Sequence, residues 1–265
     1  MQLFEFEDLA WFPRSWRRYI ADLLQFYGVK FNPYGPVVPR LKQVLEQLNC
    51  RHIVDLCSGS SGPLLLIRRQ LEEQDYPVTI TLTDFFPDRE AFQQAAAAAG
   101  GAIAFVETPV DARAVPPELT GFRTLFASFH HFDPAGAKQI LADAARRGEG
   151  IGVFEFTGRS PLQFLPMLIS PLTFWLFTPW LRPLSWARLF WTYLVPIVPL
   201  VGVWEGVASN LRTYSPAELR ELVAGIEGDY TWEIGQVRSR GGYLITYLFG
   251  YPRQPALAPL AKNKF

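Results

Sequence analysis

This sequence contains few cysteines and has no net charge. Cys50 and Cys57 are its only cysteines, too few for a disulfide framework or a zinc site, so we expect a reducing compartment, the cytoplasm. The 25 basic residues balance 25 acidic ones, whereas nucleic-acid-binding proteins usually carry a basic excess, so we expect no nucleic-acid partner. The first 19 residues place acids before bases and contain no long apolar run, which argues against a secretory signal peptide.

Hydrophobic residues, in contrast, are abundant. They make up 49% of the chain and aromatic residues make up 15%, which excludes an intrinsically disordered protein. A chain of 265 residues can bury a substantial core, either as one large domain or as one domain with an insertion.

Short β-rich runs alternate with helical runs from Arg51 onward. Aspartate or proline at the start and glycine at the end mark the helices of this region. The alternation predicts a parallel, doubly wound sheet. We expect strands at residues 52–56, 78–83, 103–106, 124–128 and 151–156, with helices at 63–71, 87–100 and 134–148.

The C-terminal part of the chain follows a different pattern. Ser215 and Glu218 form a capping box that begins a helix running to about Gly225. Two β-rich runs follow, at residues 230–238 and 243–249, and they predict a hairpin. The hairpin would make the end of the sheet antiparallel.

The expected fold is therefore α/β: a doubly wound, seven-stranded sheet with a terminal antiparallel hairpin, an N-terminal helical cap and a hydrophobic helical insertion after the fifth strand. Helices at 14–27 and 37–48 would form the cap over one edge of the sheet. The expected domain organisation is a cap at 1–50, a cofactor-binding core at 51–160, the insertion at 161–206, the rest of the core at 207–252 and a flexible tail at 253–265.

A block of small residues from Cys57 to Gly62 follows the first expected strand. Ligands of open parallel sheets bind outside the carboxyl ends of the strands, near the point where the strand order reverses. Small residues there let a ligand lie against backbone N–H groups and the next helix N-terminus. The block thus predicts a nucleotide-type binding loop, although it matches only two of the three glycines of the dinucleotide pattern G-x-G-x-x-G.

With its surroundings, this block resembles motif I of the class I, Rossmann-like S-adenosylmethionine (SAM)-dependent methyltransferases, D/E-x-G-x-G-x-G. Asp55 matches the acid and Gly59 the central glycine, while Cys57 and Ser61 replace the outer glycines. The resemblance implies that Asp55 serves the methionine end of the cofactor, that Asp84 binds the ribose hydroxyls and that Asp111 lies near the adenine. The cofactor-binding residues it implies are Asp55, Cys57, Ser58, Gly59, Asp84, Phe85, Asp111, Ala112 and Ser128.

Three side chains at the carboxyl edge are candidates for catalysis. His130 and His131 follow the fourth expected strand, and each is a general base, a hydrogen-bond partner of the acceptor or a packing residue. Glu155 ends the fifth strand and is a base or an anchor for a cationic acceptor, with Arg159 as its expected ion-pair partner. We expect no metal, because adjacent side chains rarely converge on one ion. Further candidates are Glu205 and Arg212 against the substrate, and Tyr27, Phe31 and Tyr34 over the cofactor.

The segment from Leu162 to Trp204 is unusual because Arg182 and Arg188 are its only charged residues. A membrane span fits poorly, since prolines interrupt the segment and the second apolar run is too short. An alternative is that this segment only packs in the hydrophobic core of the protein. The many tryptophans favour a lid that encloses an apolar acceptor and contacts a membrane surface.

The sequence thus predicts SAM-dependent methyl transfer to an apolar small-molecule or lipid-like acceptor by a cytoplasmic enzyme that is peripheral on the inner face of the membrane. Two alternatives stay open: an NAD(P)-dependent oxidoreductase, and a membrane-associated scaffold that binds SAM without catalysis. An exposed apolar insertion would equally suit a homo-oligomer interface.

Overall fold

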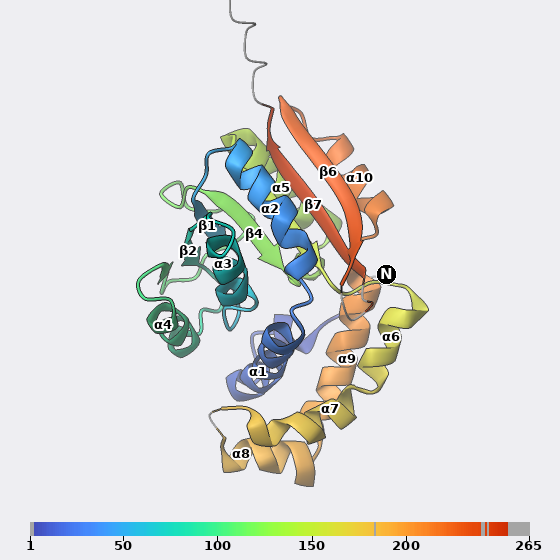
Figure 1. Ribbon diagram of the computed structural model, residues 1–265. Helices are drawn as coiled ribbons and strands as arrows, with labels where there is room; N and C mark the ends of the chain where they lie inside the picture. Colours follow the sequence, from blue (N-terminus) through green and yellow to red (C-terminus); the bar gives the residue numbers. More distant parts are fainter. Residues whose placement is uncertain (1–2, 183, 240–241, 243, 254–265) are drawn as a thin grey trace, which may run out of the picture.

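The computed structural model describes residues 3–182, 184–239, 242 and 244–253. It contains a seven-stranded sheet with the order β3-β2-β1-β4-β5-β7-β6 (Figure 1). The first five strands are parallel, and β7 runs antiparallel to both β5 and β6. The expected fold class is confirmed. The strands are β1 His52–Asp55, β2 Thr79–Leu82, β3 Ile103–Phe105, β4 Phe122–Phe126, β5 Ile151–Glu155, β6 Tyr230–Arg238 and β7 Leu244–Pro252.

Helices cover both faces of the sheet, and each face has its own apolar core. On one face α2 (Val38–Gln47), α3 (Leu64–Glu72) and α4 (Arg89–Ala98) bury side chains such as Leu41, Ile67 and Phe92. On the other face α5 (Pro134–Arg147) and α10 (Pro216–Ala224) bury Ile140 and Leu219. Fully buried side chains of this size contribute about 1.5–3 kcal/mol each.

Local capping signals set several of these helix ends. Asp133 accepts a hydrogen bond from Gly136 N–H at 2.8 Å, and the helix that it caps, α5, ends at Gly148 with φ +67°. Helix α4 begins at Arg89 instead of Pro87, because the Asp88 carboxylate caps the N–H groups of the two residues that follow Arg89. Strand β4 ends two residues earlier than expected, since Ala127 adopts φ +49° and leaves the extended conformation.

The N-terminal segment and the insertion pack on each other at the edge where the parallel strands end (Figure 1). Helix α1 (Arg14–Phe31) contributes Ile20 and Leu23 to a third apolar core, and the insertion contributes Phe174 and Val198. The insertion folds as α6 (Pro161–Leu168), α7 (Ser170–Phe177), α8 (Trp186–Leu189), a single π-turn (Phe190–Leu194) and α9 (Ile197–Arg212). We call α1, α6, α7, α8, the π-turn and α9 together the helical cap.

A buried ion pair joins the two parts of the helical cap. Arg188 of α8 pairs with Asp22 of α1 and lies 4.8 Å from the centre of the Tyr19 ring. The expected domain boundary after residue 206 lies inside the continuous helix α9. The expected tail at 253–265 lies outside the described residues, apart from Arg253.

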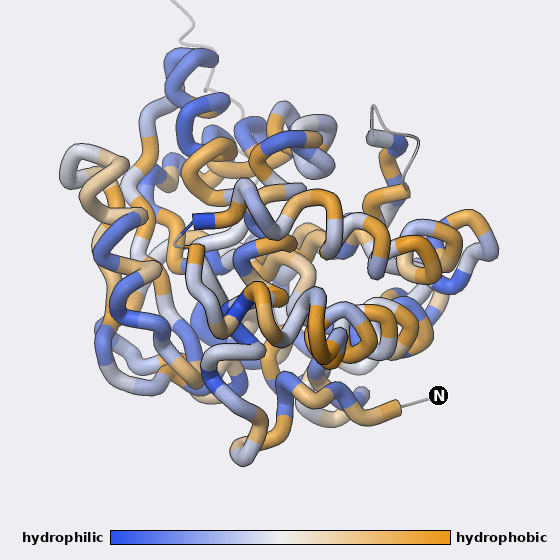
Figure 2. Tube along the Cα trace, turned by 90° about the horizontal axis from the view of Figure 1, so that it is seen from below, coloured by the Kyte–Doolittle hydropathy of each residue, from blue (hydrophilic) through white to orange (hydrophobic). Residues whose placement is uncertain are grey.

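The outer surface of the cap is apolar. Trp186 is 87% exposed and Leu194 is 73% exposed, and other large apolar side chains of the insertion, such as Leu162, Leu172 and Leu200, are also exposed. Figure 2 shows hydrophobic residues, in orange, along much of the chain trace. Among the described residues, no single helix has the length and hydropathy needed to cross a membrane. Two bent helix pairs pass that test of length and composition only when each pair is taken together: Pro161–Leu168 with Ser170–Trp180, and Trp186–Leu194 with Ile197–Arg212.

Candidate active site

The loop after β1 has an unusual backbone conformation. Cys57, Gly59 and Ser61, the three positions that match the glycines of motif I, all have positive φ, at +58°, +52° and +67°. Residues other than glycine rarely adopt this region, at a cost of about 1–2 kcal/mol each. The loop therefore keeps the backbone geometry of a glycine-rich motif with only one of its glycines. Open space lies beside Gly59, where a Cβ atom would meet nothing within 4 Å.

Asp55 lies behind this loop and braces it. Its carboxylate accepts hydrogen bonds from Ser58 Oγ at 2.7 Å and Thr124 Oγ1 at 2.5 Å. Burial raises the pKa of Asp55 to about 7, although both hydroxyl bonds act in the opposite direction. In this structure Asp55 fixes the loop from inside, and its contact with the methionine end of a cofactor stays a prediction.

Asp84 lies directly in front of the loop. Its two carboxylate oxygens accept hydrogen bonds from Gly59 N–H and Phe86 N–H, each at 2.8 Å. The Asp111 carboxylate instead forms a two-pronged ion pair with Arg113, whose hydrogen bond lowers the pKa of Asp111. The structure thus brings Asp84, but not Asp111, into direct contact with the motif I loop.

A cavity of about 2440 Å³ lies between the sheet edge and the helical cap. Its polar wall comes from the strand ends, and the Ser128 hydroxyl on that wall is buried with no partner in the part of the chain that the structure describes. The opposite wall comes from α1, α6, α7 and α9 and includes Tyr27 and Phe31; Tyr34 also lines the cavity. Asp55 and Glu155 lie behind the wall. The sequence-predicted residues that line the cavity are Cys57, Ser58, Gly59, Asp84, Phe85, Asp111, Ala112, Ser128, His130 and His131.

Glu155 orients His130. One carboxylate oxygen accepts from the backbone N–H groups of Phe129 and His130 at 2.8 and 3.2 Å, and the other lies 2.9 Å from His130 Nδ1. The expected ion pair between Glu155 and Arg159 is wrong: Arg159 pairs with Glu218 of the capping box at 2.8 Å. Glu155 is therefore a positioning residue that turns His130 Nε2 toward the cavity side.

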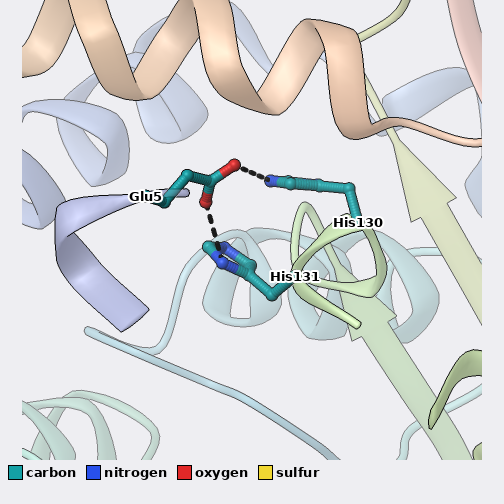
Figure 3. A group of neighbouring side chains, drawn as sticks. All are labelled: Glu5, His130 and His131. Carbon is teal, nitrogen blue, oxygen red and sulfur yellow. Dashed lines mark ion pairs between the residues drawn. The ribbon is translucent and has the colours of Figure 1, made fainter. Parts of the chain in front are cut away.

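Two acids that sequence reasoning missed complete this part of the site. His131 Nδ1 lies 2.8 Å from Glu5 Oε2, and the two histidine rings stack with their centres 4.5 Å apart (Figure 3). Asp8 Oδ1 also lies 2.8 Å from His131 Nδ1. Burial alone would lower the pKa of His131, but its hydrogen bonds to Asp8 and Glu5 outweigh burial and raise it well above its ordinary value. We call Glu5, Asp8, His130 and His131 the carboxylate–histidine cluster.

Arg212 and Glu205 of α9 pack against the carboxylate–histidine cluster. Arg212 donates to the backbone carbonyl groups of both histidines, and its Nη1 lies 2.7 Å from Asp8 Oδ2. Glu205 accepts from Phe6 N–H at 2.7 Å. Burial, with the nearby Glu7 carboxylate as a second cause, raises the pKa of Glu205 to about 8. These contacts hold the N-terminal segment against the sheet edge.

The raised pKa of Glu205 predicts a pH dependence of stability. The folded protein binds the Glu205 proton more tightly than the unfolded chain does, so stability falls as the pH rises from about 4.5 to about 8. Glu205→Gln replaces the titrating carboxyl group with an amide. The melting temperature of the variant, relative to that of the wild type, should therefore rise as the pH increases across this window. Thermal unfolding from pH 5 to pH 9 measures the difference, and a difference that does not change with pH would contradict the prediction.

Comparisons with known proteins establish the fold of this chain. No protein-family model and no curated protein matches it. It is similar to a protein from Rhodobacter sphaeroides assigned as a zinc-dependent alcohol dehydrogenase, at 12% identity and a TM-score of 0.53, over 91% of this chain and 98% of that one. The fold is Rossmann-like.

Two further solved structures are methyltransferases. The CMeT domain of the citrinin polyketide synthase matches at 12% identity and a TM-score of 0.52, over 95% of this chain and 60% of that chain. A Nostoc punctiforme protein assigned as an O-methyltransferase matches at 14% identity and a TM-score of 0.50, over 88% and 59% of the two chains. At such identities these matches show the shared fold and do not by themselves decide the activity.

Proposed function

We propose that this protein is a class I, SAM-dependent methyltransferase that acts on an apolar, lipid-like acceptor. The motif I loop carries the proposal, because all three of its glycine positions keep a left-handed backbone and its Gly59 N–H meets Asp84. The terminal hairpin β6–β7 is the antiparallel finish that the methyltransferase resemblance implies. The similarity to two methyltransferases of the same fold supports it further.

The residues present fit SAM. Each Asp84 oxygen accepts one backbone hydrogen bond, and a carboxylate oxygen can accept a second, so Asp84 retains capacity for a vicinal diol such as the ribose hydroxyls. The unpartnered Ser128 hydroxyl offers a further polar contact at the same wall. When bound, SAM supplies a methyl group on a positively charged sulfur. The protein's own part is then to position the acceptor and exclude water.

The rest of the cavity indicates the acceptor class. Its volume of about 2440 Å³ exceeds the roughly 300–1000 Å³ of ordinary ligand pockets. Leu23, Phe174 and Phe177 give its cap side an apolar surface, while His130 and His131 are polar groups on the sheet side. An acceptor with a long apolar part and one polar end matches this division, and we propose that the polar end meets the carboxylate–histidine cluster.

The exposed rim suggests where such an acceptor comes from. Leu24, Phe31, Ile169 and Leu176 line the cavity and are also exposed to solvent. The outer surface of the cap carries further exposed apolar side chains, such as Trp186 and Leu194. We propose that this surface rests on a membrane and receives the acceptor from it.

Calorimetric titration with S-adenosylhomocysteine, beside NAD as the competing cofactor, tests the proposed function. The wild type should bind S-adenosylhomocysteine at micromolar concentration and should not bind NAD. Asp84→Ala should weaken binding at least tenfold, because it removes the acceptor of the ribose hydroxyls. Glu118→Ala removes an exposed acid from outside the cavity and should bind as the wild type does.

Binding of NAD alone would favour the oxidoreductase. Binding of S-adenosylhomocysteine without methyl transfer to any fraction of a lipid extract would favour the non-catalytic scaffold. Equal binding by Asp84→Ala and Glu118→Ala would show that Asp84 has no part in the cofactor site.

A further inference from the structure

The carboxylate–histidine cluster has the composition of a metal site. Donor atoms of Glu5, His130 and His131 all lie within 4.8 Å of one another (Figure 3). Asp8 adds a second carboxylate beside His131. The sequence predicted no metal, because neighbouring histidines rarely converge. Here Glu5, from a segment 125 residues earlier, lies opposite both rings. We propose that this cluster binds one divalent transition-metal ion through His130 Nε2, His131 Nδ1 and the carboxylates of Glu5 and Asp8.

The separations between the ligand atoms suit a shared ion. His130 Nε2 lies 3.9 Å from Glu5 Oε1, and His131 Nδ1 lies 2.8 Å from both Glu5 Oε2 and Asp8 Oδ1. Ligands bonded to one ion at about 2.0–2.2 Å lie about 3–4 Å apart. The separation between His130 Nε2 and Glu5 Oε1 falls in this range, and the two separations of 2.8 Å at His131 would widen slightly when an ion binds.

The surroundings of His130 are those of a metal-bound histidine. Metal-binding imidazoles usually donate their second N–H to a carboxylate, which fixes the ring and its tautomer. Glu155 takes this place at 2.9 Å from His130 Nδ1 and is itself held by two backbone N–H groups. Arg212 fixes the backbone of both histidines through their carbonyl groups. Glu155 and Arg212 thus preorganise the two rings from behind.

The local charge also calls for a cation. Glu5 is fully buried, and its Oε2 lacks a hydrogen bond of good geometry. Two further carboxylate oxygens, Glu205 Oε2 and Glu7 Oε1, are buried and have no hydrogen-bond partner in the described part of the chain. Buried carboxylates are costly unless a proton, a cation or a metal compensates them. Arg212 reaches Asp8 Oδ2 at 2.7 Å and approaches Glu5 Oε1 at 3.7 Å, which leaves Asp8 Oδ1 and Glu5 Oε2 facing His131.

The donor set indicates which ions fit. Two imidazoles and two carboxylates suit Zn²⁺, Mn²⁺, Fe²⁺ or Co²⁺ and lack the thiolates that softer ions prefer. His130, His131, Glu5 and Asp8 line the same cavity as Ser128. A bound ion would therefore face that cavity and could hold the polar atom of a ligand there. The inference rests on the geometry of the cluster and not on the identity of the cofactor.

Titration of the chelator-treated full-length protein with Co²⁺ tests the proposal, because Co²⁺ reports nitrogen and oxygen ligation in its visible spectrum. We expect saturation at one ion per chain, confirmed by competition with Zn²⁺ in calorimetry. His131→Ala and Glu5→Gln should each weaken binding more than tenfold. Glu155→Gln should weaken it about 10- to 100-fold, because the Glu155 carboxylate orients the His130 ring. His52 is the third histidine of the chain and lies at the N-terminal end of β1, away from the edge where the parallel strands end. His52→Ala is therefore a matched control that should bind the ion as the wild type does.

Two results would overturn the proposal. Absence of saturable binding by the folded wild type would show that the cluster is an ion-pair network in which Arg212 and a protonated His131 supply the compensating charges. Binding that survives both His131→Ala and Glu5→Gln would place the ion elsewhere. Because the wild-type titration decides the first point, the test does not depend on the variants folding.

Discussion

Arg123→Ala is expected to lower the free energy of unfolding by about 3–5 kcal/mol, which would leave a domain of ordinary stability barely folded. The Arg123 side chain is fully buried in β4, with Nη1 2.7 Å from Asp143 and Nε 2.7 Å from Glu149. Burial acts to raise the pKa of Asp143, but its hydrogen bond to Arg123 and the positive charges of Arg123, Arg147 and Arg146 together lower it. Removing Arg123 leaves a buried carboxylate without its inner partner and opens a cavity beside it.

Arg146→Ala is the matched control for this prediction. Arg146 pairs with the same Asp143 carboxylate, but its side chain is 73% exposed, so its loss should cost less than about 1 kcal/mol. Urea unfolding of the two variants and the wild type measures both values. Similar losses for Arg123→Ala and Arg146→Ala would show that burial does not set the strength of this network.

The double variant Trp186→Ser, Leu194→Ser is expected to reduce binding to lipid vesicles by at least about 30-fold. Both side chains are mostly exposed at the tip of the cap, where they line a shallow apolar hollow with Phe190. Partial burial of each in a bilayer interface would contribute about 1–2 kcal/mol, and a loss of 2 kcal/mol is about 30-fold. Flotation with vesicles of neutral and of anionic lipids measures the change.

The exposed position of both side chains makes the test selective, since neither substitution should affect the fold or S-adenosylhomocysteine binding. Arg182→Ala, an exposed charge on the same insertion, separates apolar from electrostatic attraction and should change binding much less. Wild-type protein that stays entirely in the soluble fraction would refute the membrane contact. If the wild type instead formed dimers that the double variant lost, the apolar surface would be a subunit interface.

The core of the fold could be predicted because its signals are local. The Asp133 cap, the Ser215–Glu218 capping box and the small residues after β1 each act within a few positions of one another. The left-handed conformation of Cys57 and Ser61 could not be predicted, since their residue types disfavour it and only the surrounding packing imposes it.

The polar end of the site was harder to predict because its parts are far apart in the sequence. Glu5 and Asp8 lie in an aromatic N-terminal stretch with no recognisable motif, and only the packing of η1 (Phe6–Asp8) on α9 brings them to the histidines. Glu155 was expected to be a base or an anchor for a cationic acceptor, and its contact with His130 Nδ1 at 2.9 Å could not be seen in the sequence. The sequence offered one signal for this part of the site, namely that Glu5 and Asp8 lie among aromatic residues without a sequence-based explanation.

The hydrogen bond from Phe6 N–H to Glu205 joins residues 199 positions apart, and this separation has a consequence for biosynthesis. A ribosome adds about 5–20 residues per second, so the N-terminal segment is made roughly 10–40 s before its partner helix exists. During that interval Phe6, Trp11 and Phe12 have no docking surface and are available to a chaperone. The newly made chain therefore completes this part of its site only after α9 has been synthesised.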